Sequence, residues 1–150
     1  MSTIAIDVMG GDHGVAAAVS AAASISLDQE VGVLLVGDQG QIDPVLRRSR
    51  YDAGYLTVHH TPYSIGMDES PKDALKAKPD ASIALGAKLV AQGSADALVS
   101  AGNTGGCILA CAQHFRRLEG VPRTALAAVF PTERRRGEKD DPFSLILDVG

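Results

Sequence analysis

The fold is decided by the stretch Asp96-Ala97-Leu98-Val99-Ser100-Ala101-Gly102-Asn103-Thr104-Gly105-Gly106. Its first half is an apolar run that is typical of a buried strand. Its second half is a glycine-rich turn that leads into a helix. Small residues at such a turn let a ligand approach the backbone closely, so the stretch predicts a ligand-binding turn in an α/β enzyme domain.

Apolar runs alternate with helical segments along the rest of the chain. We expect strands at residues 4–6, 31–36, 55–59, 97–100, 126–130 and 144–149. We expect helices at residues 15–27, 41–50 and 104–118, with Pro44 in the first turn of the second. We also expect a short helix within residues 61–79, and a helix that is capped by Asp80 or Ser82 and runs to Gly93. Strands that are apolar throughout and separated by helices predict a mostly parallel sheet with helices on both faces, the three-layer α/β/α class.

The composition is that of an ordinary globular protein. The 150 residues are 45% hydrophobic, 21% charged and only 4% aromatic, so Ala, Val, Leu and Ile must form the core. We expect one α/β domain over residues 1–150. The formal net charge of -4 provides no general attraction to nucleic acid or to anionic membranes.

Several features favour the cytoplasm. The N-terminus lacks the basic and apolar regions of a signal peptide, and no apolar run approaches the roughly 20 residues that span a bilayer. The two cysteines, Cys107 and Cys111, lie one helical turn apart and provide no disulfide framework. The last residues, Leu147-Asp148-Val149-Gly150, end where a strand would end, so we expect a chain that is cut short.

The turn at residues 100–106 favours an anion. The free N–H groups and the dipole at the start of the following helix attract a group such as phosphate, and Asn103 and Thr104 can add side-chain hydrogen bonds. A plain strand-to-helix turn in which Asn103 or Thr104 caps the helix explains the same residues. Neither the Walker spacing nor the Gly-x-Gly-x-x-Gly spacing is present.

A second candidate loop follows the first strand as Asp7-Val8-Met9-Gly10-Gly11-Asp12-His13. Two carboxylates and an imidazole beside a Gly-Gly turn can bind a ligand or exchange protons. A turn stabilised by aspartate side chains is the structural alternative. In a parallel sheet the two loops can lie at the same edge, and together they favour a site more strongly than either does alone.

These two loops resemble signatures of the phosphate acyltransferase family of bacterial phospholipid synthesis (the PlsX family). Three further stretches agree in order along the chain: Leu35-Val36-Gly37-Asp38, Met67-Asp68-Glu69-Ser70-Pro71 and Leu147-Asp148-Val149-Gly150. The chain departs from the family pattern at Gly14-Val15, at Gly106, and at the reduced lysine-rich stretch of residues 76–83. The resemblance identifies the N-terminal portion of a family member, since the family continues into a further lobe.

The resemblance implies transfer of a long-chain acyl group from acyl carrier protein to inorganic phosphate, which gives acyl phosphate. It also implies a fold related to isocitrate dehydrogenase and phosphotransacetylase, a homodimer and no cofactor or metal, with association with the membrane surface left open. The residues that it places at the phosphate site are Ser100, Gly102, Asn103, Thr104 and Gly105. The residues that it places on the facing wall are Asp7, Gly10, Gly11, Asp12 and His13.

The chemistry requires phosphate to be held, the thioester carbonyl to be polarised and a tetrahedral oxyanion to be stabilised. We assign catalytic roles to His13, which can move a proton or donate to the oxyanion, and to Asn103. A phosphotransacetylase-like enzyme that uses short coenzyme A thioesters is one alternative. A non-catalytic fragment that binds a ligand or oligomerises is another.

Weaker candidates lie elsewhere. Cys107, Cys111 and His114 share a helix face and could hold a metal, but three ligands on one helix reach one ion with difficulty, and we favour burial of the cysteines in the core.

A basic group could attract an acidic carrier protein, but acidic neighbours make a solvated loop the favoured interpretation. The group consists of Arg116, Arg117, Arg123, Arg134, Arg135 and Arg136.

Two further stretches have structural explanations. His59 and His60 end a strand and are expected to be structural or exposed rather than catalytic. Met67-Asp68-Glu69-Ser70-Pro71 could shape an acyl or dimer contact, while a helix start with Ser70 as cap and Pro71 in the first position explains it equally well.

Overall fold

A computed structural model describes residues 1–122, 126–131 and 143–147 of the chain. The chain divides into two compact units, Met1–Arg116 and Arg117–Gly150, and each is described by itself. The organisation as one domain that the sequence predicts stays a prediction.

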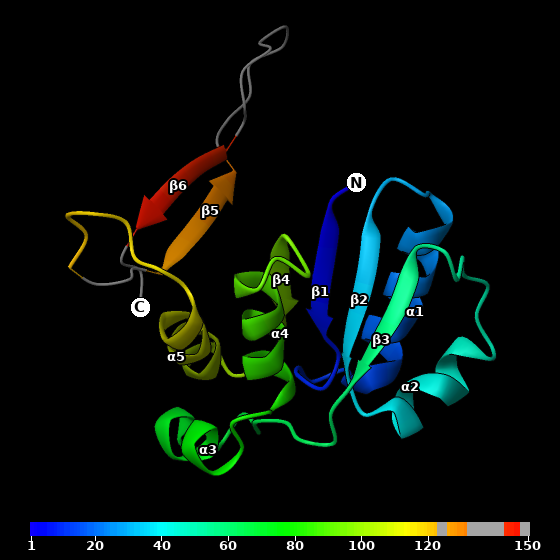
Figure 1. Ribbon diagram of the computed structural model, residues 1–150, viewed down its shortest axis with the longest axis horizontal. Coiled ribbons are helices and arrows are strands. Elements are labelled where there is room, and N and C mark those ends of the chain that lie inside the picture. Colours follow the sequence, from blue (N-terminus) through cyan, green and yellow to red (C-terminus); the bar gives the residue numbers. More distant parts are fainter. Residues whose placement is uncertain (123–125, 132–142, 148–150) are drawn as a thin grey trace, which may run out of the picture. The chain divides into compact units, whose positions relative to one another are not determined.

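A four-stranded parallel sheet forms the centre of the first unit (Figure 1). Its strands are β1 (Thr3–Asp7), β2 (Gly32–Gly37), β3 (Leu56–His60) and β4 (Ala97–Ser100). They lie in the order β3-β2-β1-β4, and every neighbouring pair is parallel. The α/β class with a mostly parallel sheet is therefore confirmed.

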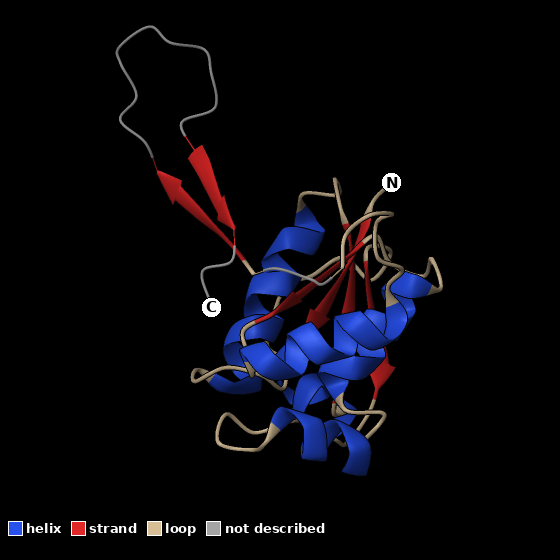
Figure 2. Cartoon of the chain, turned by 90° about the vertical axis from the view of Figure 1, so that its left-hand side faces the viewer, coloured by secondary structure: helices blue, strands red, loops and turns tan. Residues whose placement is uncertain are grey.

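Helices cover both faces of this sheet (Figure 2). On one face lie α1 (Gly14–Leu27) and α2 (Gln39–Leu46), and on the other lies α4 (Ser82–Ala91). Helix α5 (Thr104–His114) packs on α4, and α3 (Pro71–Ala77) packs on α5. Within the described residues, none of the helices is both long and apolar enough to cross a bilayer.

Small and branched aliphatic residues form the core on each face. On the α1 and α2 face, Val19, Leu35 and Ile42 are completely buried. On the α4 face, Ala5 and Val36 pack with Leu89. With so few aromatic residues in the chain, close packing of alanine on alanine and valine holds the helices against the sheet.

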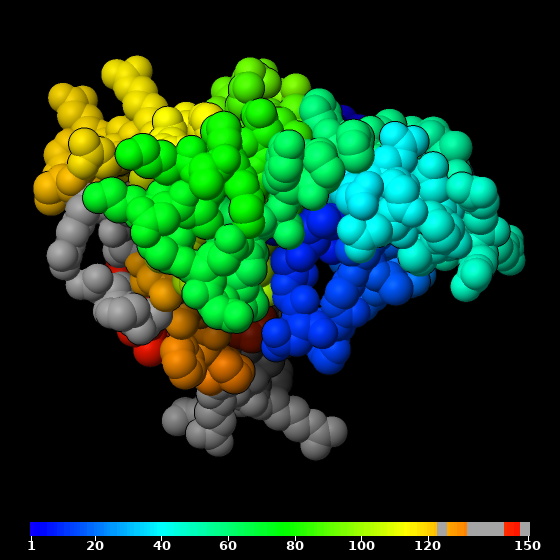
Figure 3. Space-filling view, turned by 90° about the horizontal axis from the view of Figure 1, so that it is seen from below, coloured from blue at the N-terminus to red at the C-terminus, as the bar shows by residue number. Residues whose placement is uncertain are grey.

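The order of the strands reverses between β1 and β4. The chain builds outward from β1 to β3 and then returns to place β4 on the opposite side of β1. Open α/β sheets bind ligands at such a reversal, outside the carboxyl ends of the strands. Figure 3 looks onto this edge, where the segment that follows β1 (blue) lies beside the segment that contains α3 (green).

Three helices have ends that differ from the sequence prediction. Helix α2 begins two residues earlier than predicted, with the Asp38 side chain as its cap, so Pro44 lies inside the helix and not in its first turn. The helix ends at Leu46, and hydrogen bonds between residues three apart replace the helical bonds after it. The cap position of α4 is Ala81, without a side-chain hydrogen bond, in place of Asp80 or Ser82. Helix α5 ends at His114 because the following Phe115 has an extended backbone.

Strand β4 is less buried than its apolar sequence indicates. It forms one edge of this sheet, with β3 at the other, and α4 covers one of its faces. Val99 points away from that helix and is 52% exposed. The prediction of a buried strand at residues 97–100 is therefore wrong for the sheet that the structure describes, because apolar composition does not reveal which strand forms the edge.

The second unit contains a two-stranded antiparallel sheet. Strand β5 (Ala127–Pro131) pairs with β6 (Phe143–Leu147), and Val129 lies opposite Leu145. Both expected strands are present within one residue of the predicted start, and the predicted end of the second lies outside the described residues. They pair with each other and do not extend the parallel sheet.

Replacing Leu35 by alanine tests the central core. Leu35 is completely buried on β2, so Leu35→Ala should lower the free energy of unfolding by about 2–5 kcal/mol through lost burial and a residual cavity. The matched control is Leu27→Ala at the end of α1, where the leucine is 45% exposed. Urea unfolding followed by circular dichroism compares the two; equal losses would show that the core is not where the structure places it.

Candidate active site

A hydrogen bond joins the ends of β1 and β4. The two strands are in register with Asp7 opposite Ser100, and the Ser100 hydroxyl donates to Asp7 Oδ2 at 2.8 Å. The other carboxylate oxygen of Asp7 accepts from Met9 N at 3.1 Å, and Gly102 N donates to Ser100 Oγ at 3.1 Å. Asp7 is only 4% exposed, so this bonding fixes the direction in which both loops leave the sheet.

The two glycine-rich loops touch backbone to backbone. A Cβ atom on Gly10 would lie 2.6 Å from Gly102 Cα, which leaves no space for a side chain. Gly11 has a φ of +93° and lies against Ala101. Glycine adopts this φ without strain, whereas other residues do so rarely. The expectation that the loops lie at one edge of the sheet is confirmed.

An open pocket of about 180 Å³ lies beside this contact. It is lined by Gly10, Gly11, Asp12, His13, Gly14, Ala17, Ala18 and Ala101. Four of the five residues that we expected on the facing wall are therefore brought together here. Asp7 is not among them because its carboxylate is turned toward Ser100.

The polar groups of the pocket are Asp12, His13 and the start of α1. Both side chains are exposed, and His13 occupies the cap position of α1 without a side-chain hydrogen bond to the helix. The first turn of α1 contains no acidic residue. Its unbonded N–H groups therefore present a partial positive charge that nothing in the helix neutralises.

The turn after β4 ends in a capped helix. Asn103 precedes α5, and its Oδ1 accepts from Gly106 N at 2.9 Å. The capping interpretation thus holds for Asn103, while Thr104 is exposed. Gly105 lies against Pro71. Asn103, Thr104 and Gly105 do not line the 180 Å³ pocket, so their contact with phosphate stays a prediction.

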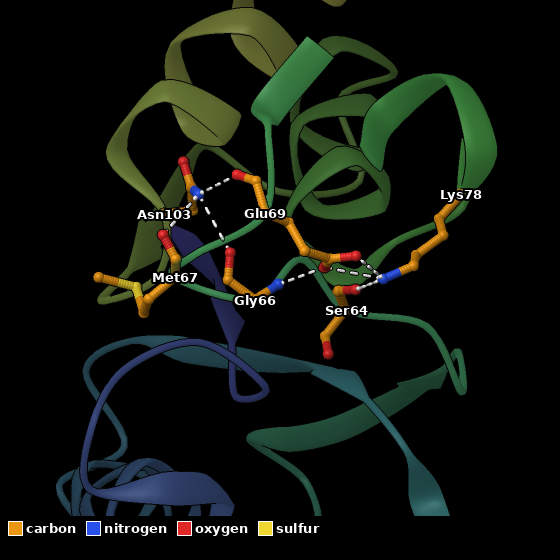
Figure 4. A network of polar contacts seen from close by, with 6 residues as sticks. All are labelled: Ser64, Gly66, Met67, Glu69, Lys78 and Asn103. Atoms are coloured by element: carbon orange, nitrogen blue, oxygen red, sulfur yellow. Dashed lines mark hydrogen bonds and ion pairs between the residues drawn. The ribbon is translucent and has the colours of Figure 1, made fainter. Parts of the chain in front are cut away.

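The Asn103 side chain faces a loop that the sequence did not connect with it. Its Nδ2 group donates to main-chain carbonyls of Gly66, Met67 and Glu69 (Figure 4). The sequence indicated residues 67–71 as a match to the family, with either an acyl or dimer contact or a helix start as their role. Pro71 does begin α3, but Ser70 makes no side-chain capping bond. No periodicity or motif in the sequence signals the carbonyls that hold Asn103.

The two cysteines lie on one side of α5 against the α4 core. Both are half-buried, in agreement with the expected packing. Within the described residues, no three His, Cys, Asp or Glu side chains are grouped so that they could hold a metal ion, and this includes the set with His114. The Cys111 thiol donates to Cys107, which lowers the pKa of Cys107 to about 7 against the opposing effects of burial and Asp7.

The remaining candidates fall outside the site. His60 Nδ1 accepts from Gln39 N at 3.1 Å, which is a structural role, and His59 is exposed, as expected. Arg116 and Arg117 are exposed. The four other arginines of the basic group, Arg123, Arg134, Arg135 and Arg136, lie outside the described residues.

Comparison with known proteins decides the family. A family model described as "Fatty acid synthesis protein" matches residues 2–150. The chain belongs to the fatty acid synthesis protein family. The resemblance seen in the two loops is thereby confirmed, and the family match covers both units of the chain.

Curated relatives of the chain are named phosphate acyltransferase. The chain is 39% identical to that of Oleidesulfovibrio alaskensis over 148 residues, which are 98% of the chain and 40% of the relative. It is 40% identical to that of Nitratidesulfovibrio vulgaris, over 98% of the chain and 41% of the relative. It is 37% identical to that of Coxiella burnetii, over 100% of the chain and 43% of the relative. The chain thus spans about two fifths of the length of these relatives.

Removing the Ser100 hydroxyl tests the joint between the loops. Ser100→Ala should lower the free energy of unfolding by about 1–3 kcal/mol, because the buried Asp7 carboxylate and Gly102 N lose a partner. The control is Ser24→Ala, where the hydroxyl donates only to Ser20 O on an exposed face of α1. Chemical denaturation measures both; a Ser100 variant as stable as the Ser24 variant would contradict the arrangement.

The thiol pair makes a pH-dependent prediction. Below about pH 7 Cys107 is protonated, and above it the thiolate dominates, so its rate of alkylation by iodoacetamide should rise with a midpoint near pH 7. Cys111→Ala removes the donor and should move the midpoint upward, whereas Cys111→Ser keeps a donor and should move it less. Mass spectrometry of the Cys107 peptide gives the rates, and a midpoint that is insensitive to both changes would refute the hydrogen bond.

Proposed function

We propose that this protein transfers a long-chain acyl group from an acyl carrier protein thioester to inorganic phosphate, and that the product is an acyl phosphate. One observation carries the proposal: the loops after β1 and β4 meet at the reversal of strand order and border an open pocket with His13 and Asp12. Membership of the family and the names of the relatives support acyl transfer to phosphate.

Phosphate is held in this proposal by main-chain N–H groups. The start of α1 faces the pocket, and the start of α5 follows the neighbouring loop. Both helix ends favour an anion. Hydrogenphosphate retains one proton at neutral pH, and the Asp12 carboxylate can accept a hydrogen bond from it. Ser100, Gly102, Asn103, Thr104 and Gly105 retain their proposed place on the side of β4, with Asp7, Gly10 and Gly11 opposite.

The proposed reaction is a direct attack without a covalent enzyme intermediate. A phosphate oxygen adds to the thioester carbonyl, and the resulting oxyanion collapses with cleavage of the carbon–sulfur bond. The proton of hydrogenphosphate is transferred to the departing thiolate, which leaves as a thiol. His13 is exposed at the pocket and free of other hydrogen bonds in the described residues, so it can move this proton or donate to the oxyanion.

The proposal also covers the oligomeric state, the cofactor requirement and the location of the protein. We propose a cytoplasmic homodimer that uses no cofactor and can rest on the inner face of the membrane.

Release of free thiol tests the activity. The protein is incubated with a long-chain acyl carrier protein thioester, with and without phosphate, and free thiol is measured with a chromogenic reagent. The proposal requires release that depends on phosphate and saturates with it. A parallel series with short coenzyme A thioesters separates the phosphotransacetylase alternative, which would prefer them. Binding of phosphate without turnover of either thioester would favour the non-catalytic alternative.

His13 provides the sharpest variant. His13→Ala should lower the turnover number by about 100-fold or more, because a positioned proton-transfer group is lost. His59→Ala is the matched control, since His59 is also exposed and lies near the same edge of the sheet but outside the pocket. Steady-state kinetics compare the two, and equal rates would remove His13 from the mechanism. Asn103→Ala should also reduce turnover, and unchanged turnover would refute the role of Asn103.

A further inference from the structure

The Asn103 side chain uses all of its hydrogen-bonding groups within the protein. Its Nδ2 group lies 3.1 Å from Gly66 O, 3.4 Å from Met67 O and 3.2 Å from Glu69 O, and its Oδ1 accepts from Gly106 N at 2.9 Å. Asn103 is 8% exposed. One side chain therefore ties the start of α5 to the loop of residues 64–69.

A charged pair closes this loop on itself (Figure 4). Both carboxylate oxygens of Glu69 lie 2.8 Å from Lys78 Nζ, and one of them also accepts from Gly66 N at 2.6 Å. Lys78 Nζ donates in addition to Ser64 O at 3.0 Å. The pair thus bonds to the main chain at Ser64 and Gly66, in the first half of the loop, while Glu69 itself lies at the end of the loop. The bonds of Lys78 and Gly66 lower the pKa of Glu69.

Global stability does not explain this pair. The Glu69 and Lys78 side chains are 42% and 31% exposed, and ion pairs of such exposure contribute little to the free energy of unfolding. Gly66, Met67 and Glu69 are all exposed, and Ile65 is the buried anchor of the loop. Besides the pair, a turn in which Glu69 N donates to Gly66 O at 3.3 Å holds the carbonyls that meet Asn103. The effect of the pair is therefore on the geometry of the loop.

The conformation of the 64–69 loop affects the candidate site because Asn103 connects the two. Asn103 follows Gly102, which abuts Gly10, and Asn103 begins α5. A change in the direction of the carbonyls at residues 66–69 would move the Asn103 side chain, and with it the turn between Ser100 and Gly105.

We propose that Glu69 and Lys78 are positioning residues, which hold the carbonyls of the 64–69 loop on Asn103 and thereby fix the glycine turn after β4 for phosphate. Neither residue touches the substrate. The catalytic part of this proposal rests on the proposed function, whereas the structural part can be measured without turnover.

Hydrogen exchange tests the structural part. In Lys78→Met and Glu69→Ala, the Gly106 amide should exchange about tenfold faster or more, because its cap on Asn103 is released more often. Lys76→Met is the matched control, since Lys76 lies in the last turn of α3, two residues before Lys78, and makes no ion pair within the described residues. Lys78→Arg keeps a donor for both Glu69 and Ser64 and should restore slow exchange.

Kinetics test the catalytic part. Lys78→Met and Glu69→Ala should lower kcat/KM for phosphate by about tenfold or more, with little change in the unfolding midpoint, because misplacement of a site by a fraction of an ångström is costly. Lys76→Met and Lys78→Arg should stay near the original rate.

The outcomes separate the two proposals. Gly106 exchange that matches the Lys76→Met control would overturn the positioning role, and so would faster exchange with unchanged kcat/KM. If no form of the protein turns over any thioester, the proposed function fails, and the exchange rates alone decide whether Glu69 and Lys78 hold Asn103.

Discussion

The close approach of Gly10 to Gly102 is the constraint on which the candidate site depends. Two loops from strands 93 residues apart meet with no room for a single Cβ atom between them, and the Asp7–Ser100 hydrogen bond holds the strand ends on which they sit. Because the backbones themselves are in contact, the pocket is bordered by main-chain groups more than by long side chains. Such a site can be rigid without aromatic or bulky residues, in keeping with the composition of the chain.

Much of this arrangement could be predicted from the sequence. Strands β1, β2 and β4 are short and largely apolar, and glycine residues follow soon after β1 and β4, so the parallel sheet and the two loops follow from pattern alone. The wall formed by Gly10, Gly11, Asp12 and His13 could also be predicted, because these residues are adjacent along the chain. The exposure of individual side chains, which depends on tertiary packing, could not be predicted. The exposure of Val99 depends on which strand is at the edge, and only the order of the strands reveals it.

The bonds around Asn103 escaped prediction for a related reason. Its partners are backbone carbonyls of a loop 34 to 37 residues away in sequence, and every residue has a carbonyl. Glu69 and Lys78 are nine residues apart, with α3 between them, which matches neither a helical nor a strand repeat. Contacts that depend on main-chain atoms leave no mark on residue type, so sequence analysis identified Asn103 as a binding residue and overlooked what surrounds it.

The two sides of the Asn103 amide would respond differently to a carboxylate in its place. Aspartate caps a helix as well as asparagine does, so the bond to Gly106 N would survive hydrolysis of the side-chain amide to an acid. The opposite side would not, because a carboxylate oxygen would then face three carbonyl oxygens in place of a donor. Replacement of the amide nitrogen by an oxygen atom would thus leave the start of α5 intact and repel the loop of residues 64–69. The fold would therefore tolerate a carboxylate at this position, and the candidate site would not.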